Sequence, residues 1–130
     1  MPMVSKQLLP LVFAGGAFGT SLRYSIEILV GTLPQGPIIV TSIVNLLGAA
    51  ALGFVTANRF FASSTRQGFW GVGFLGGFTT MSGLAVITAG TEFGLSAAGP
   101  IYWLLVLTQL LVGVAAYRLG LILAGGADAK

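Results

Sequence analysis

The sequence predicts an all-α membrane protein built as a single domain over residues 1–130. Of the 130 residues, 55% are hydrophobic and only 7% are charged, and the mean hydropathy is +0.97. Soluble domains carry about 25% charged residues, so this chain has too few charges to cover a surface that faces water. Four apolar segments are each long enough to cross a bilayer, which takes roughly 20 residues.

The four expected transmembrane helices cover residues 7–30, 37–57, 68–91 and 100–124. No small-residue cleavage site is followed by a soluble domain, so we expect the first segment to be retained as a helix rather than removed as a signal peptide. The second segment follows the turn "GTLPQGP", and the fourth begins with Pro100, a residue suited to a first helical turn. The connections are short and leave no room for a soluble domain.

Composition excludes several classes of function. The chain has no cysteine and no histidine, which excludes disulfides, thiolate metal sites and the commonest proton shuttle. We find no nucleophile–base pair and therefore expect no enzymatic activity. The net charge of +3 is small and scattered, so we expect no nucleic-acid partner.

The distribution of charge predicts a multi-pass protein of the cell (inner) membrane with both termini in the cytoplasm. Four spans place the termini and the loop between the second and third helices on one side of the membrane. That side holds the positive charges Lys6, Arg59, Arg66, Arg118 and Lys130. The opposite side has "GTLPQGP", without charge, and a loop whose single charge is Glu92. Cytoplasmic loops carry the excess of Lys and Arg.

Small residues predict tight helix packing and oligomerisation. Glycines let helix backbones approach closely in a membrane, and they occur in "GGAFG" of the first helix, between Gly48 and Gly53 of the second, and at Gly113 of the fourth. A bundle of only four helices encloses little interior, so we expect the protein to form oligomers.

Two polar positions at membrane depth each have two interpretations. Asn45 lies near the middle of the second helix, with Thr41 one turn earlier on the same face. Its amide either forms a helix–helix hydrogen bond or faces a path through water. Arg23 and Glu27 are spaced i, i+4 and either pair near the membrane boundary or let Arg23 attract anions into an aqueous vestibule.

The stretch "GFLGGFTTMSGL", residues 73–84, interrupts an uncharged segment with glycines, threonines and a serine. Gly76 and Gly77 have low helix propensity, and Thr79 and Thr80 are β-branched. The glycines could form a packing notch and the threonines could bond their own helix, which would then be continuous. Alternatively the helix breaks here, and its freed carbonyls could surround a cation, as in the broken helices of transporters.

These residues resemble the Fluc (CrcB-like) fluoride channels. The resemblance rests on "GGAFGTSLRY" in the first helix, the central Asn of the second and "GFLGGFTTMSGL" in the third. It covers the whole chain. The resemblance implies a passive channel that exports fluoride and so reduces its toxicity. It also implies a third helix broken in mid-membrane and an antiparallel dimer with two pores.

The resemblance assigns roles to particular residues. A structural sodium ion at the dimer centre would be held by the backbone carbonyls of Gly76 and Thr79. Fluoride would meet Asn45, with Thr41 beside it, and then Thr80 and Ser82 after the break. Arg23 would lie in the vestibule. The amide, the hydroxyls and the positive edges of aromatic rings are donors that could replace the water around fluoride.

The chain departs from the family pattern at two pore positions. Met81 and Leu84 stand where the family has phenylalanines whose ring edges face fluoride. The fourth helix retains only Thr108 and Gln109 of an expected polar track, and the expected serine falls on Gly113 or Val114.

Two dimers are compatible with these departures: a homodimer with an altered pore, or a heterodimer whose partner keeps the rings. The strong charge bias favours the heterodimer, because each chain of an antiparallel homodimer must insert both ways. A non-conducting assembly subunit is an alternative. A small multidrug transporter is less favoured, because it needs a carboxylate inside the first helix and Glu27 lies at its far end.

Overall fold

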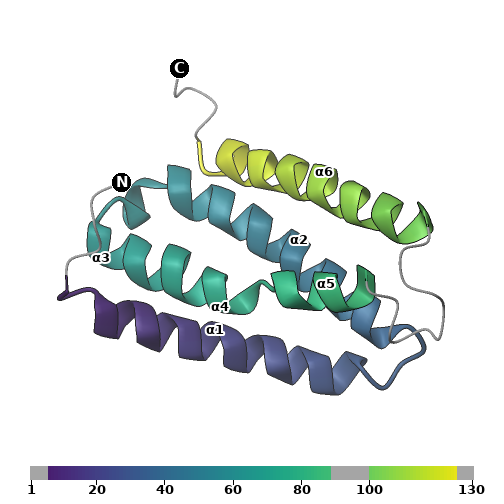
Figure 1. Cartoon of the computed structure of the whole chain (residues 1–130). Coiled ribbons are helices and arrows are strands. Elements are labelled where there is room, and N and C mark those ends of the chain that lie inside the picture. The colour runs from purple at the N-terminus through teal and green to yellow at the C-terminus, as the bar shows by residue number, and fades with distance from the viewer. Residues whose placement is uncertain (1–5, 89–99, 126–130) are drawn as a thin grey trace.

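The computed structural model describes residues 6–88 and 100–125, and all regular structure within these residues is helical (Figure 1). The expectation of an all-α chain is therefore confirmed. The helical elements, in chain order, are α1 (Leu9–Val30), α2 (Gly36–Ala57), η1 (Arg59–Phe61), α3 (Ser64–Arg66), η2 (Gln67–Leu75), α4 (Gly76–Phe78), α5 (Met81–Thr88) and α6 (Pro100–Leu123).

These elements form four helical segments in the four expected ranges, with η2, α4 and α5 together making the third. Residues 89–91 of the third expected span, Glu92 and Lys130 lie outside the described residues. Within the described residues, two helices are long and apolar enough to cross a membrane. They are α2, with a mean hydropathy of 2.2, and the Trp103–Leu123 part of α6, with 1.8. Only 6% of the apolar stretch of α6 is buried within the chain. Its side chains therefore require contact with lipid or with another subunit.

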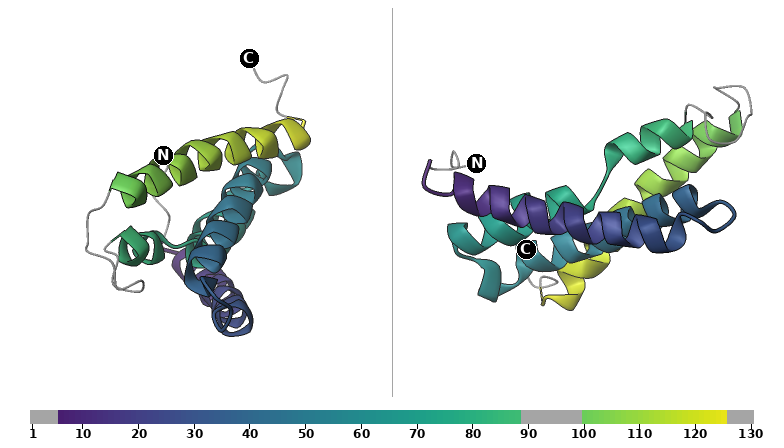
Figure 2. Two further views of the ribbon diagram at one scale, coloured as in Figure 1. Left: turned by 90° about the vertical axis from the view of Figure 1, so that its right-hand side faces the viewer. Right: turned by 90° about the horizontal axis from the view of Figure 1, so that it is seen from below.

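The four segments pack as two pairs, α1 with the third segment and α2 with α6, and α2 also contacts the third segment. Helix α1 runs along η2 and α4, and α6 runs along α2 on the side away from α1 (Figure 1, Figure 2). The buried core lies where α2 meets α4, and it consists of Val40, Val44 and Phe78, with Ile26 and Val30 packed against it. This core supports the end of α4 from one side.

Glycines set the closest helix contacts, as the sequence suggested. A Cβ at Gly19 would collide with the backbone of Phe74, and a Cβ at Gly53 would collide with the backbone of Tyr117. Gly113 differs, because no described atom lies within 4 Å of the place a Cβ would take. Gly113 therefore makes no close helix contact within one chain.

The segment η2 is wound as a π-helix over nine residues, a feature that the sequence did not predict. Aromatic side chains of η2 and α4 form a row, with ring centroids 5.4 Å apart between Trp70 and Phe74 and 6.2 Å apart between Phe74 and Phe78. π-helical turns are rare and are frequent at functional sites. This one leads directly into the polar stretch.

Candidate functional site

The helical backbone stops at Thr79 and Thr80. Helix α4 ends at Phe78, and Thr79 has an extended backbone with φ −82° and ψ 159°. Helix α5 then begins at Met81, and Thr80 caps it, because its Oγ1 accepts a hydrogen bond of 3.0 Å from the backbone N–H of Gly83. A threonine at this position is a good N-cap. The same two threonines that lower helix propensity thus end one helix and start the next.

Asn45 connects α2 to this interruption through two hydrogen bonds to one residue. Its Oδ1 accepts from the backbone N–H of Thr80 at 2.8 Å, and its Nδ2 donates to the Thr80 carbonyl at 3.0 Å. The amide of Asn45 thus forms a helix–helix hydrogen bond, the first of the two interpretations above. A carboxamide has two N–H donors, so the second donor of Asn45 is not used in this pair.

The interruption releases three backbone carbonyls from their usual helical donors. In a continuous α-helix, the N–H of residue i bonds the carbonyl of residue i−4. The N–H of Thr80 goes to Asn45 instead of Gly76, and the N–H of Gly83 goes to the Thr80 hydroxyl instead of Thr79. The carbonyl of Gly77 has new partners from α1, described next. The carbonyls of Gly76 and Thr79 have therefore lost the N–H donors that a continuous helix would give them.

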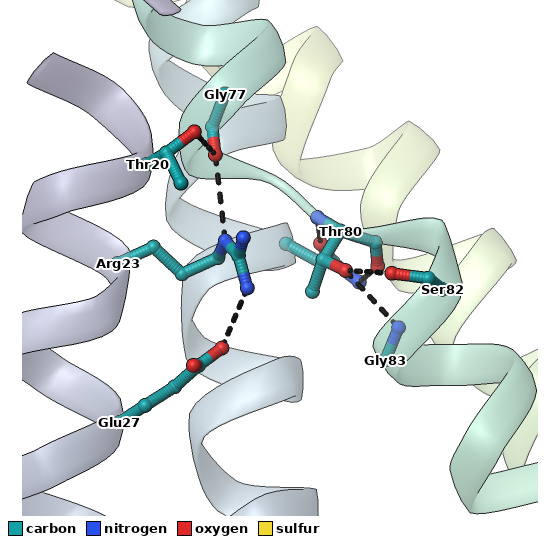
Figure 3. Close-up of polar contacts among 8 residues, drawn as sticks. Thr20, Arg23, Glu27, Gly77, Thr80, Ser82 and Gly83 are labelled. Carbon is teal, nitrogen blue, oxygen red and sulfur yellow. Dashed lines mark hydrogen bonds and ion pairs between the residues drawn. The ribbon is translucent and has the colours of Figure 1, made fainter. Parts of the chain in front are cut away.

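Arg23 and Thr20 cover the third carbonyl. The hydroxyl of Thr20 donates to the Gly77 carbonyl at 3.3 Å, and Nε of Arg23 donates to it at 3.4 Å (Figure 3). The same guanidinium forms a salt bridge of 2.7 Å with Glu27. Figure 3 shows Arg23 between Gly77 and Glu27, so its charge and its donors are engaged on the α1 side of the interruption.

A groove lies on the other side of the interruption, between α2, the third segment and α6. Its volume is about 840 Å³. It is lined by six of the predicted site residues, Asn45, Gly76, Thr79, Thr80, Met81 and Leu84. No described atom lies within 4 Å of a Cβ placed at Gly76, so the backbone there is open to the groove. Gly48 leaves the room that the methyl group of Thr79 occupies.

The other predicted residues lie around this groove without lining it. Thr41 is buried, and its hydroxyl oxygen lies next to Gly83 of α5. Ser82 is exposed, and its hydroxyl lies 3.0 Å from that of Thr80. Of the two predicted apolar residues that do line the groove, Met81 is 71% exposed and Leu84 is buried. The structure therefore brings the hydroxyls of Thr80 and Ser82 together.

Sequence reasoning missed the role of two residues. Thr20 was not singled out, although it lies one turn before Arg23 on the same helix. Ser42 was also missed, and its hydroxyl accepts a hydrogen bond of 2.7 Å from Nε2 of Gln109. Among the residues that the structure describes, Oε1 of Gln109 is buried without a partner. A glutamine in an apolar helix was the available signal, but its partner on α2 was not predictable from spacing.

Comparisons with known proteins place this geometry in context. The family described as CrcB-like protein, Camphor Resistance (CrcB), matches residues 10–121. A relative from Leifsonia xyli, named fluoride-specific ion channel FluC 2, is 36% identical over 87% of this chain and 80% of its own length. A relative from Roseiflexus, named fluoride-specific ion channel FluC, is 36% identical over 84% of this chain and 90% of its own length.

A further relative is covered less fully. The protein from Corynebacterium jeikeium, named fluoride-specific ion channel FluC 2, is 33% identical over 62% of this chain, and the match spans 58% of the relative's length. No solved structure matches this chain.

Proposed function

This chain belongs to the CrcB-like protein family, and we propose that it is one subunit of a passive, fluoride-selective channel that exports fluoride. The observation that carries the proposal is the match over residues 10–121 together with relatives that are named fluoride-specific ion channels. The chain is a membrane protein and not an enzyme.

The chemistry of the groove is compatible with an anion path. Fluoride is small and strongly hydrated, so a pore must offer N–H and O–H donors in place of water. The free N–H of Asn45 and the paired hydroxyls of Thr80 and Ser82 are such donors. Met81 and Leu84 line the same groove but offer no donor and no ring edge, so we propose that this chain contributes the polar half of a pore.

We also propose that a sodium ion is held at the interruption. The residues fit such an ion, because the Gly76 and Thr79 carbonyls have lost their helical donors and both residues line the groove. Carbonyls of unwound helix are typical sodium ligands. This pair and the corresponding pair of an antiparallel second subunit would supply four oxygens. A bound sodium ion would add a positive charge that attracts an anion where the dielectric constant is low.

The second subunit is proposed to be a homologous chain in the opposite orientation. The open groove and the exposed apolar face of α6 support a partner, and the charge bias supports a fixed orientation with cytoplasmic termini. An exporter of the multidrug type is disfavoured, because Glu27 is engaged by Arg23 at 2.7 Å. The missing rings at Met81 and Leu84 keep the non-conducting subunit as the second candidate.

Growth in fluoride tests this proposal. We expect a bacterium that lacks its own fluoride channels to resist fluoride when it expresses this chain with a second CrcB-like chain whose positive loops lie on the opposite side. Each chain expressed alone is the matched control and should give no resistance. Full resistance from this chain alone would overturn the heterodimer. Resistance from the second chain alone, unchanged by this one, would favour the non-conducting subunit.

A further inference from the structure

The side-chain amide of Asn45 bonds both the N–H and the carbonyl of Thr80, the residue at which the third segment is interrupted. Its two bonds to Thr80, at 2.8 Å and 3.0 Å, are among the shorter side-chain hydrogen bonds across the fold. Asn45 is only half-buried as a residue, but Thr80 is 8% exposed. The bonds therefore lie at a nearly dry position, where an unpaired backbone group is costly.

Two acceptors compete for a single donor at this point. The N–H of Thr80 can bond either the side chain of Asn45 or the carbonyl of Gly76, four residues earlier. It bonds Asn45, so the Gly76 carbonyl loses this donor, and Gly76 lines the groove. If the side-chain acceptor were absent, the nearest way to satisfy the N–H of Thr80 would be to extend α4 by one residue, because that pairs this N–H with the Gly76 carbonyl.

We propose that Asn45 is a positioning residue that keeps the helix interrupted, and that by holding the N–H of Thr80 it leaves the Gly76 carbonyl free to bind a monovalent cation. The inference rests on the proposed cation site and adds a cause for it. Asn45 would thus act on the cation through the backbone, in addition to any contact that its second N–H makes with an anion.

If Asn45 acts by holding the N–H of Thr80, a second substitution that removes this N–H should restore the cation binding that Asn45→Leu loses. Replacing Asn45 by leucine removes the competing acceptor and should let Thr80 rejoin Gly76. Replacing Thr80 by proline removes the N–H itself, so the Gly76 carbonyl has no donor to recapture it. Proline also suits this place, because it favours an extended residue before it, and Thr79 already has φ −82° and ψ 159°. The double variant Asn45→Leu/Thr80→Pro should therefore regain what Asn45→Leu loses.

The experiment measures thermal unfolding of the assembled full-length protein in detergent without fluoride. Each variant is compared in sodium chloride and in N-methyl-D-glucamine chloride at equal ionic strength. We expect sodium to raise the unfolding midpoint of the unmodified protein. That rise should disappear in Asn45→Leu and return in the double variant. Thr108→Val is the matched control, because its hydroxyl bonds its own helix at Leu104 and is exposed, and it should keep the full rise.

Each outcome decides the inference. A sodium-dependent rise that survives in Asn45→Leu would overturn it, as would the absence of any rise in the unmodified protein. If Asn45→Leu does not fold, Thr80→Pro alone decides, and loss of the sodium-dependent rise there would overturn the inference. The measurement contains no fluoride, so a failure of fluoride transport would overturn the proposed function and leave this result standing.

Discussion

Replacing Arg23 by alanine is expected to lower the stability of the protein by about 2 kcal/mol, because it removes a partly exposed ion pair and a hydrogen bond from a charged group. Arg23 contacts both Glu27 and the Gly77 carbonyl, and its side chain is only 23% exposed. Its loss leaves the Glu27 carboxylate, whose side chain is 39% exposed, without its partner, and it removes one of the two donors to Gly77. Chemical unfolding of the purified protein in detergent, followed by tryptophan fluorescence, measures the change.

Two variants separate the parts of this effect. Arg23→Lys keeps the charge but lacks the planar fork that reaches two acceptors at once, so an intermediate loss is expected. The double variant Arg23→Ala/Glu27→Gln removes the unpaired charge but not the lost bond to Gly77, so it should recover part of the stability. If Arg23→Ala were as stable as the unmodified protein and only slowed fluoride transport, Arg23 would act as the free vestibule cation that the family resemblance suggests.

Replacing Met81 and Leu84 by phenylalanine is expected to raise fluoride conduction by this chain about ten-fold. Ring contacts contribute about 0.5–1.5 kcal/mol each, and 1.36 kcal/mol in a barrier corresponds to a factor of ten. Both positions line the groove. Met81 is 71% exposed and should accept a ring readily. Leu84 is buried and should tolerate one only after local repacking.

Fluoride efflux from liposomes that contain this chain together with a second CrcB-like chain of opposite charge bias is the measurement for these variants. Met81→Leu and Leu84→Met are the matched controls, because they change shape without adding a ring, and they should leave efflux at its original level. Equal efflux from the phenylalanine and control variants would contradict the idea that the missing rings limit conduction through this chain.

The sequence was sufficient to predict the helical segments but not the winding of the third. The expected ranges 7–30, 37–57 and 100–124 lie within two residues of the bounds of α1, α2 and α6, because long apolar runs between turn residues leave little choice. The π-helical winding of η2 was not predictable. Its hydrogen bonds skip one more residue than those of an α-helix, and no residue type in "QGFWGVGFL" marks that difference.

The candidate site was predictable in its residues but not in its partners. Low helix propensity directed attention to Gly76, Thr79 and Thr80; Gly76 keeps helical dihedral angles and the backbone becomes extended at Thr79. The partner of Asn45 depends on how α2 is rotated against the third segment, and only packing sets that rotation. For the same reason the sequence paired Arg23 with Glu27, four residues away, and missed the contact with Gly77, 54 residues away.

Efflux of fluoride and chloride from liposomes tests the central claim most directly. The liposomes are loaded with both anions and contain either this chain alone or this chain with a second CrcB-like chain of opposite charge bias. The account predicts that the pair releases fluoride and retains chloride, whereas the single chain releases little of either. Release of both anions at equal rates, or retention of fluoride by the pair, would contradict the assignment of this chain to a fluoride-selective channel.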